Sequence, residues 1–248
     1  MARHDSHRHR TRSTGERSRD LVLGDVLYRV RRCLHQDGQL KSQEQEVTGL
    51  RVVGLDLSLT STGVALPDGS TVALAFRGRI TAAPTLRRQM ESIEDYGRAR
   101  REYQRTELLE ILRSEHVDLI ASEMPYISHL TQPTVELIEL HGMVRDIAER
   151  RDIPWTGVSP STLKQFATGN GGADKPMMAS ALSTEHGLTA GTDDEVDAMW
   201  LQIMAVEYYD GCMYPATPAK TARGKATPHP RTKAFASVRW PFLMAAAA

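Results

Sequence analysis

The stretch VVGLDLSLTSTGVAL, residues 52–66, carries most of the information on the architecture of this chain. An apolar run leads into a carboxylate at Asp56, a turn rich in Ser and Thr follows, and a second apolar run leaves it. This pattern predicts a β-hairpin in a protein core, with one acid at the end of its first strand. A charged Asp there is costly unless a metal, a Lys or Arg, or backbone N–H groups pair with it. On its own, Asp56 is equally well explained as a residue that caps the turn.

The composition predicts one folded domain with basic segments at both ends. The chain has 248 residues, of which 40% are hydrophobic, and its formal net charge is zero. Residues 1–20 contain six Arg against three acids, and residues 211–248 contain six Lys or Arg and no acid. We predict a basic disordered tail plus a short helix over residues 1–48, a domain over 49–210, and a second basic disordered tail over 211–248. The tails either touch a polyanion or only keep the protein soluble.

The remaining composition excludes several classes of protein. Cys33 and Cys212 are the only cysteines, so neither a disulfide framework nor a cysteine-ligated metal is expected. No apolar run approaches the length of about 20 residues that a membrane span needs. The N-terminus also lacks the apolar region of a signal peptide. We therefore expect a protein of the reducing cytoplasm with no membrane partner.

The rest of the chain predicts an α/β domain. Strands and helices are expected at the following positions: strands 50–57, 62–67, 71–80, 117–123 and 153–158, and helices 21–34, 85–115, 134–150, 159–166 and 193–209. Asp174 is expected to cap one more helix, which has Pro176 in its first turn. Three consecutive strands followed by alternating helices and strands are typical of a mixed sheet flanked by helices.

Four carboxylates fall where they can converge. Asp56 and Glu123 each end a predicted strand, and Asp194 and Asp197 are spaced i and i+3 on one face of the last helix. Clustered carboxylates repel one another, so they either share protons or hold a divalent cation. Hard oxygen ligands without His or Cys favour Mg²⁺ or Mn²⁺. For Asp194 a simpler alternative is charge complementarity at a helix N-terminus, which explains Asp197 less well.

One segment carries a specific resemblance. The stretch LKQFATGNGGADK, residues 163–175, is similar to the Val-Lys-Gln, Thr-Gly-Asn-Gly and Ala-Asp-Lys motif of the RuvC family of Holliday-junction resolvases. The acids described above match the family's first-strand Asp, second-motif Glu and last-helix acid pair, and the similarity runs in order from about residue 50 to 209. Leu57-Ser58 replaces the family's Pro-Gly, and Ser122 replaces an apolar residue.

The resemblance implies an RNase H-like fold and a homodimer that cuts four-way DNA junctions by paired symmetric nicks. It implies Mg²⁺ as cofactor, with two ions per active site and Mn²⁺ as a substitute. The residues it assigns are metal ligands at Asp56, Glu123, Asp194 and Asp197, which are also catalytic, a catalytic Lys175, and DNA contacts from Lys164, Lys175, Tyr126, Thr168 and Asn170.

Three alternatives remain open at this point. A nuclease of the same fold that cuts branched or flap DNA would use the same acids. Actin-like ATP-binding proteins share the hairpin of residues 52–66, but the chain has no second phosphate loop of the Asp-Gly-Gly-Gly-Thr kind. A DNA-structure binder without catalysis is the third, and the intact set of acids argues against it.

Overall fold

A computed structural model describes residues 49–77, 86–210 and 229–243. The basic residues 1–20 and the helix expected over 21–34 lie outside the described residues, as does most of the predicted second tail. No helix in the described ranges is both long and apolar enough to cross a lipid bilayer.

A five-stranded sheet forms the centre of the domain. Its strands are β1 (Val52–Asp56), β2 (Ser61–Ala65), β3 (Thr71–Ala75), β4 (Leu119–Glu123) and β5 (Trp155–Val158). They lie in the order β3-β2-β1-β4-β5. The first three form an antiparallel meander, and β4 and β5 run parallel to β1. The predicted mixed sheet flanked by helices is therefore confirmed. The two short turns allow hairpins, and the helices between β3, β4 and β5 allow the crossovers that parallel strands need.

Six described helices flank this sheet. They are α2 (Leu86–Ser114), α3 (Gln132–Glu149), α4 (Pro160–Thr168), α5 (Lys175–His186), α6 (Asp193–Tyr209) and α7 (Pro230–Ala236). The N-caps are side-chain oxygens: Ser159 accepts from the N–H of Thr162, and Asp174 accepts from the N–H of Met177. Helices α4 and α5, which these residues cap, also have Pro in the first turn, where no N–H is required.

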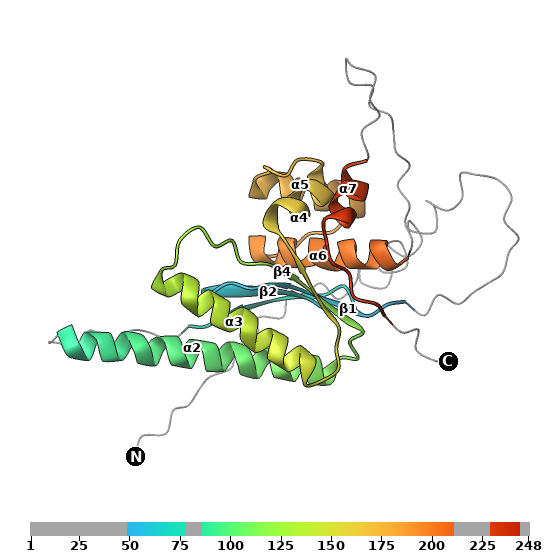
Figure 1. Cartoon of the computed structure of the whole chain (residues 1–248). Helices are drawn as coiled ribbons and strands as arrows, with labels where there is room; N and C mark the ends of the chain where they lie inside the picture. The colour runs from blue at the N-terminus through green and yellow to red at the C-terminus, as the bar shows by residue number, and fades with distance from the viewer. Residues whose placement is uncertain (1–48, 78–85, 211–228, 244–248) are drawn as a thin grey trace, which may run out of the picture. The chain divides into compact units, whose positions relative to one another are not determined.

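Helices α2 and α3 lie on one face of the sheet and α6 lies on the other, with α4, α5 and α7 on the outer side of α6 (Figure 1). Side chains alternate across a strand, so Val53 and Leu55 of β1 pack with α2 and α3, while Val52 packs on the opposite face with α6, α4 and α5. Trp200 and Phe166 are fully buried on the second face, with their rings edge to face and their centroids 5.9 Å apart. Each face of the sheet therefore has its own apolar core.

Helix α6 lies directly on the sheet because two strand positions have no side chain. A Cβ added at Gly54 would lie 2.0 Å from the carbonyl oxygen of Ala198. A Cβ added at Gly63 would lie 2.0 Å from the carbonyl oxygen of Asp194. Neither contact is possible for a real Cβ, so these two glycines set how closely α6 approaches β1 and β2.

We expect Gly63→Ala to lower the melting temperature by about 5–10 °C. Overpacking typically costs about 1–3 kcal/mol and occasionally more, and each kcal/mol corresponds to about 2–4 °C for a chain of this size. The control is Gly142→Ala in α3, where an added Cβ meets nothing within 4 Å. That change should leave stability equal or slightly higher, because Ala suits a helix better than Gly. Equal melting curves for both variants would show that α6 does not rest on β2 as closely as described.

The C-terminal segment corrects the sequence-based prediction. Residues 211–248 were expected to be a disordered tail, but within them α7 packs against α4 and α6. Arg231 is buried there: its guanidinium donates to both carboxylate oxygens of Glu207 at 3.0 and 3.2 Å, to Glu185, and to the carbonyl oxygen of Phe166. The guanidinium also lies 4.6 Å from the centroid of the Phe166 ring. The prediction is therefore wrong for residues 229–243, where one buried arginine ties the segment to the domain.

Candidate active site

The first two acids lie side by side at one edge of the sheet. Asp56 ends β1 and Glu123 ends β4, and these strands are parallel neighbours. Leu55 pairs with Ser122, so the next residue of each strand is the acid. Parallel strands end at the same edge, which places both carboxylates there, as their positions in the sequence predicted.

The second pair of acids comes from the start of α6. Thr192 caps this helix by accepting from the N–H of Glu195 at 3.2 Å, and its hydroxyl donates to the Glu195 carboxylate at 3.0 Å. Glu195 is buried in that role. Asp194 and Asp197 are half-buried, and the Asp194 backbone lies over Gly63, the residue that pairs with Asp56. The glycine contact therefore brings the helix acids next to the strand acids.

The pKa values of three of these acids are raised, and each is affected by the charge of at least one other acid. Burial raises the pKa of Asp56 to about 8, with further increases from the charges of Glu123, Asp197 and Asp194. Burial and the charge of Asp197 raise the pKa of Glu123 to about 7. Burial raises the pKa of Asp197 to about 6. Acids with strongly raised pKa values are often found at functional sites, because burying like charges next to one another costs free energy.

The four carboxylates have the chemistry of a divalent-cation site, but in this structure they are not grouped closely enough to hold an ion. Their oxygens are hard ligands, and a cation would offset the repulsion that raises these pKa values. Within the described ranges, however, no three acid, His or Cys side chains are grouped closely enough to hold a metal ion. The residues therefore fit Mg²⁺ by type and by electrostatics, and binding an ion would require the carboxylates to rotate towards one another.

Two lysines from the motif segment lie beside the acids. Lys164 on α4 is half-buried, and its charge lowers the pKa of Glu123 and of Asp197. Lys175 at the start of α5 is exposed, and its charge lowers the pKa of Asp56 and of Asp197. Its Nζ lies 3.1 Å from Asp193, which raises the pKa of Lys175 through a hydrogen bond. The structure thus brings both predicted lysines to the acids.

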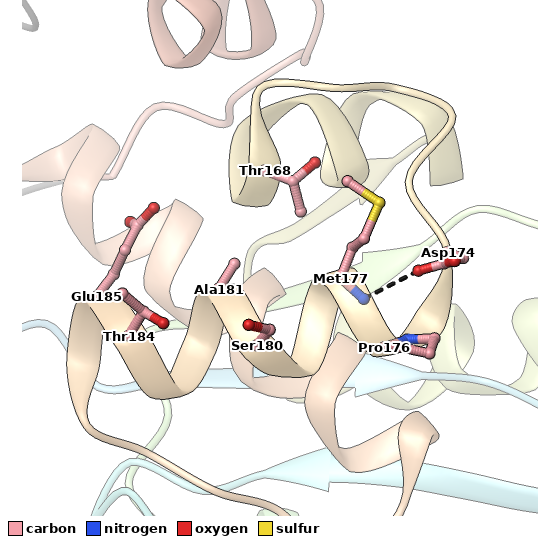
Figure 2. Close-up of a pocket in the computed structure, with 8 residues that line it drawn as sticks. All are labelled: Thr168, Asp174, Pro176, Met177, Ser180, Ala181, Thr184 and Glu185. Atoms are coloured by element: carbon pink, nitrogen blue, oxygen red, sulfur yellow. Dashed lines mark hydrogen bonds between the residues drawn. The ribbon is translucent and has the colours of Figure 1, made fainter.

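The loop between α4 and α5 is shaped by its own side chains. Thr168 donates to the carbonyl oxygen of Lys164 at 2.9 Å and accepts from the N–H of Asn170 at 3.1 Å. Asn170 accepts from the N–H of Gly172 at 3.0 Å, and Gly169 caps α4 with a φ of 76°. Figure 2 shows Thr168 facing α5 across a shallow groove. Both predicted DNA contacts therefore also fix the shape of the loop.

Tyr126 lies three residues after Glu123, in the loop between β4 and α3. Its side chain is 81% exposed, and Met124, Ile127 and Leu130 of the same loop are exposed as well. Several exposed apolar side chains in one loop are typical of an interaction surface. The DNA contact expected of Tyr126 stays a prediction.

Two parts of the site were missed by the sequence analysis. Asp193 forms an ion pair with Lys175, a role that the sequence analysis did not assign to it. Gly63 allows Asp194 to approach Asp56, although a glycine in a strand gives no sign of what lies above it. An isolated glycine in a strand pattern is the one signal that was available, because it often marks a close backbone approach.

The raised pKa values predict a stability that depends on pH. The unfolded chain loses these protons near pH 4, whereas the folded chain keeps them up to about pH 6 to 8. Stability from these acids is therefore complete below pH 4 and falls as pH rises through that window. We expect metal-free Asp56→Asn to melt about 5 °C above wild type at pH 8, with the difference vanishing near pH 4.

The measurement is a series of melting curves from pH 4 to 8 with a chelator present. Asp146→Asn is the control, because Asp146 is an exposed acid on α3 that pairs with Arg150 and lies outside the site. Adding Mg²⁺ should raise the melting temperature of wild type more than that of Asp56→Asn. A difference between the proteins that is constant across pH would show that Asp56 is not desolvated.

Two sequence relatives and one solved structure show what this chain is similar to. No protein-family model matches the chain. It is 25% identical over 155 residues to the crossover junction endodeoxyribonuclease RuvC of Caldicellulosiruptor saccharolyticus, covering 60% of this chain and 88% of that protein. It is 27% identical over 157 residues to the protein of the same name from Nocardia farcinica, covering 62% and 79%.

A structural comparison finds the T. thermophilus RuvC in complex with a Holliday junction substrate, at 19% identity and a TM-score of 0.48, covering 66% of this chain and 97% of that one. Fold and site together define an α/β domain with an acidic centre. The chain is RuvC-like in sequence, as the motif of residues 163–175 predicted.

Proposed function

We propose that this chain is a magnesium-dependent endonuclease that resolves four-way DNA junctions by paired symmetric nicks. The observation that carries the proposal is the convergence of Asp56, Glu123 and Asp197 from three elements into one site, where burial and mutual repulsion raise their pKa values. The names of the sequence relatives support the reaction class, since both are crossover junction endodeoxyribonucleases.

The acids are assigned the role of metal ligands. Asp56, Glu123, Asp194 and Asp197 would hold two Mg²⁺ ions, for which Mn²⁺ can substitute, because their oxygens suit either ion. When bound, such ions polarise the scissile phosphate and lower the pKa of a bound water. Loss of protons from these acids precedes metal binding, so the affinity for Mg²⁺ should rise between pH 6 and pH 8.

The lysines and the loop residues are assigned to the DNA. Lys164 and Lys175 would stabilise the charge that builds on the phosphate in the transition state. Thr168 and Asn170 would contact the backbone next to it, and Tyr126 would stack on a base at the junction point. Phosphate contacts carry no sequence information, so any sequence preference must come from bases near Tyr126.

We expect Lys164→Ala and Lys175→Ala to slow cleavage by about a hundredfold while weakening DNA binding much less. A charge placed at the transition state acts on the rate more than on ground-state affinity. Single-turnover cleavage at saturating protein measures the rate, and Arg113→Ala on α2 is a control outside the site. Variants that bind far more weakly but cut normally when saturated would assign these lysines to positioning only.

Paired nicking requires two active sites. A four-way junction is nearly two-fold symmetric, so one site per chain calls for a two-fold dimer. Light scattering should give about twice the chain mass of 27.6 kDa. A cruciform plasmid should become linear within one binding event, whereas nicked circles alone from a lasting monomer would favour a flap or branched-DNA nuclease.

A further inference from the structure

One buried glutamine interrupts the apolar face of α2. Gln104 precedes Leu108 and Leu112 at helical spacing, and those two leucines belong to the core between α2 and the sheet. Gln104 is itself completely buried, with a relative exposure of 0%. Glutamine is mostly an exposed residue, so a fully buried one on a core-facing stripe calls for a specific reason.

The reason lies in the turn that follows Asp56. The Nε2 of Gln104 donates to the carbonyl oxygen of Ser58 at 2.9 Å and to the hydroxyl of Thr62 at 3.3 Å. Thr62 is also completely buried, and its hydroxyl donates to the same Ser58 carbonyl at 3.3 Å and accepts from the Ser58 N–H at 3.5 Å. Gln104 thus joins both ends of the turn to a helix 42 to 46 residues away.

These contacts lie next to the acids in the chain. Ser58 lies two residues after Asp56, and Thr62 immediately precedes Gly63, which pairs with Asp56 and lies under Asp194. The turn of residues 57–60 contains no proline, so none of its residues has a fixed φ. A turn without that restraint needs another one if the carboxylate before it is to be held in place.

The orientation of the amide is determined by its neighbours. Gln104 Oε1 is buried and has no hydrogen-bond partner among the residues that the structure describes. Reversing the amide would place Oε1 against the Ser58 carbonyl oxygen, an unfavourable contact between two acceptors. An unpaired buried oxygen costs about 1–3 kcal/mol, and an apolar residue of the same length would avoid that cost. The Nε2 group of Gln104, which donates both hydrogen bonds, is therefore the part of the amide that contacts the turn.

We propose that Gln104 is a positioning residue that, through Ser58 and Thr62, holds the turn after Asp56 and so fixes the end of β1 from which the Asp56 carboxylate can reach a metal ion. The proposal rests on the proposed function only for its catalytic consequence. Its structural part, the restraint of residues 57–62, holds in the metal-free protein whether or not the chain cuts DNA.

The test uses the full chain and variants of matching shape. Gln104→Met keeps the length and removes the donor, while Thr62→Val keeps the shape and removes the hydroxyl, and Thr62→Ser keeps the hydroxyl. The control is Gln202→Met, because Gln202 on α6 also donates from inside the domain, to the carbonyl oxygens of Val52 and Leu66 at 2.8 and 2.7 Å, but at the far end of β1 and β2.

Two quantities are measured, and the first needs no activity. Hydrogen exchange of the metal-free protein should be at least about tenfold faster at amides 57–62 in Gln104→Met and Thr62→Val, with β4 amides unchanged as reference. The Mg²⁺ concentration for half-maximal cleavage should rise roughly tenfold, with the KM for DNA unchanged, because losing such a supporting contact typically costs 10- to 100-fold. Thr62→Ser should match wild type in both, and Gln202→Met should change neither.

The outcomes separate the two proposals. Unchanged exchange at residues 57–62 in both Gln104→Met and Thr62→Val would overturn the positioning role even if wild type cuts junctions. Faster exchange in the two variants, together with a wild-type protein that cuts no DNA, would support the restraint and overturn the proposed nuclease activity. If Gln104→Met does not fold, the contrast between Thr62→Val and Thr62→Ser decides, and equal behaviour of that pair would overturn the role of the network.

Discussion

Asp56→Asn, Glu123→Gln and Asp197→Asn should each reduce junction cleavage by about a thousandfold or more while junction binding survives. Single groups that stabilise a transition state electrostatically are commonly worth about a hundredfold to a thousandfold. Each of these changes also removes a proposed metal ligand, so the loss is expected at or above the upper end of that range. Affinity for DNA comes mainly from contacts to phosphates, which these carboxylates do not make.

The measurement is single-turnover cleavage next to a binding titration on the same junction. Asp146→Asn is the matched control, because it replaces an exposed acid of α3 that pairs with Arg150. It should cut and bind as wild type does. Asp56→Asn protein that cuts at a rate near that of wild type would contradict the assignment of the acids.

Arg231→Met should destabilise the protein by about 3–5 kcal/mol, which corresponds to roughly 10 °C or more in melting temperature. The change leaves Glu207 buried without its bidentate partner and removes the cation from the face of Phe166. Breaking one side of a buried pair costs more than the pair contributes, because a desolvated charge remains. A chain that ends at residue 228 should lose similar stability, since it lacks α7 entirely.

The control for Arg231→Met lies on the same helix. Lys233 is exposed, and Lys233→Met should leave the melting temperature unchanged. Adding Glu207→Met to Arg231→Met should recover part of the loss, because the buried Glu207 charge is then removed together with the guanidinium that it accepts from. If Arg231→Met and Lys233→Met melt alike, the C-terminal segment is not held to the domain by this ion pair.

The sequence predicted those parts of the domain whose signals are local. Helix α6 was expected over residues 193–209 and is observed there, because Thr192 and the acids that follow mark its start and apolar residues continue it. The ends of β1 and β4 were also predicted, since a buried run that ends in a carboxylate is visible in one stretch of sequence. These elements were enough to choose the four candidate acids, which are Asp56, Glu123, Asp194 and Asp197.

The parts that the sequence could not predict depend on contacts between distant residues. Segment 229–243 is composed like a tail, and it becomes part of the domain through contacts with residues far away in the sequence. These include the ion pair of Arg231 with Glu207 and the stacking of Trp240 on Tyr208. The same holds for Gln104, whose partners are more than 40 residues away. No local pattern identifies a residue whose role is set by a neighbour across the fold, which is also why Asp193 was not recognised as the partner of Lys175.

The most direct test of the central claim compares DNA substrates with the same purified chain. Labelled four-way, three-way, flap and duplex DNA are incubated side by side with Mg²⁺, and Asp56→Asn is run in parallel. We predict that the four-way junction is cut far faster than the others, at two symmetric positions, and that Asp56→Asn cuts none of them. Equal cutting of flap or duplex DNA, or cleavage by wild type and Asp56→Asn alike, would contradict it.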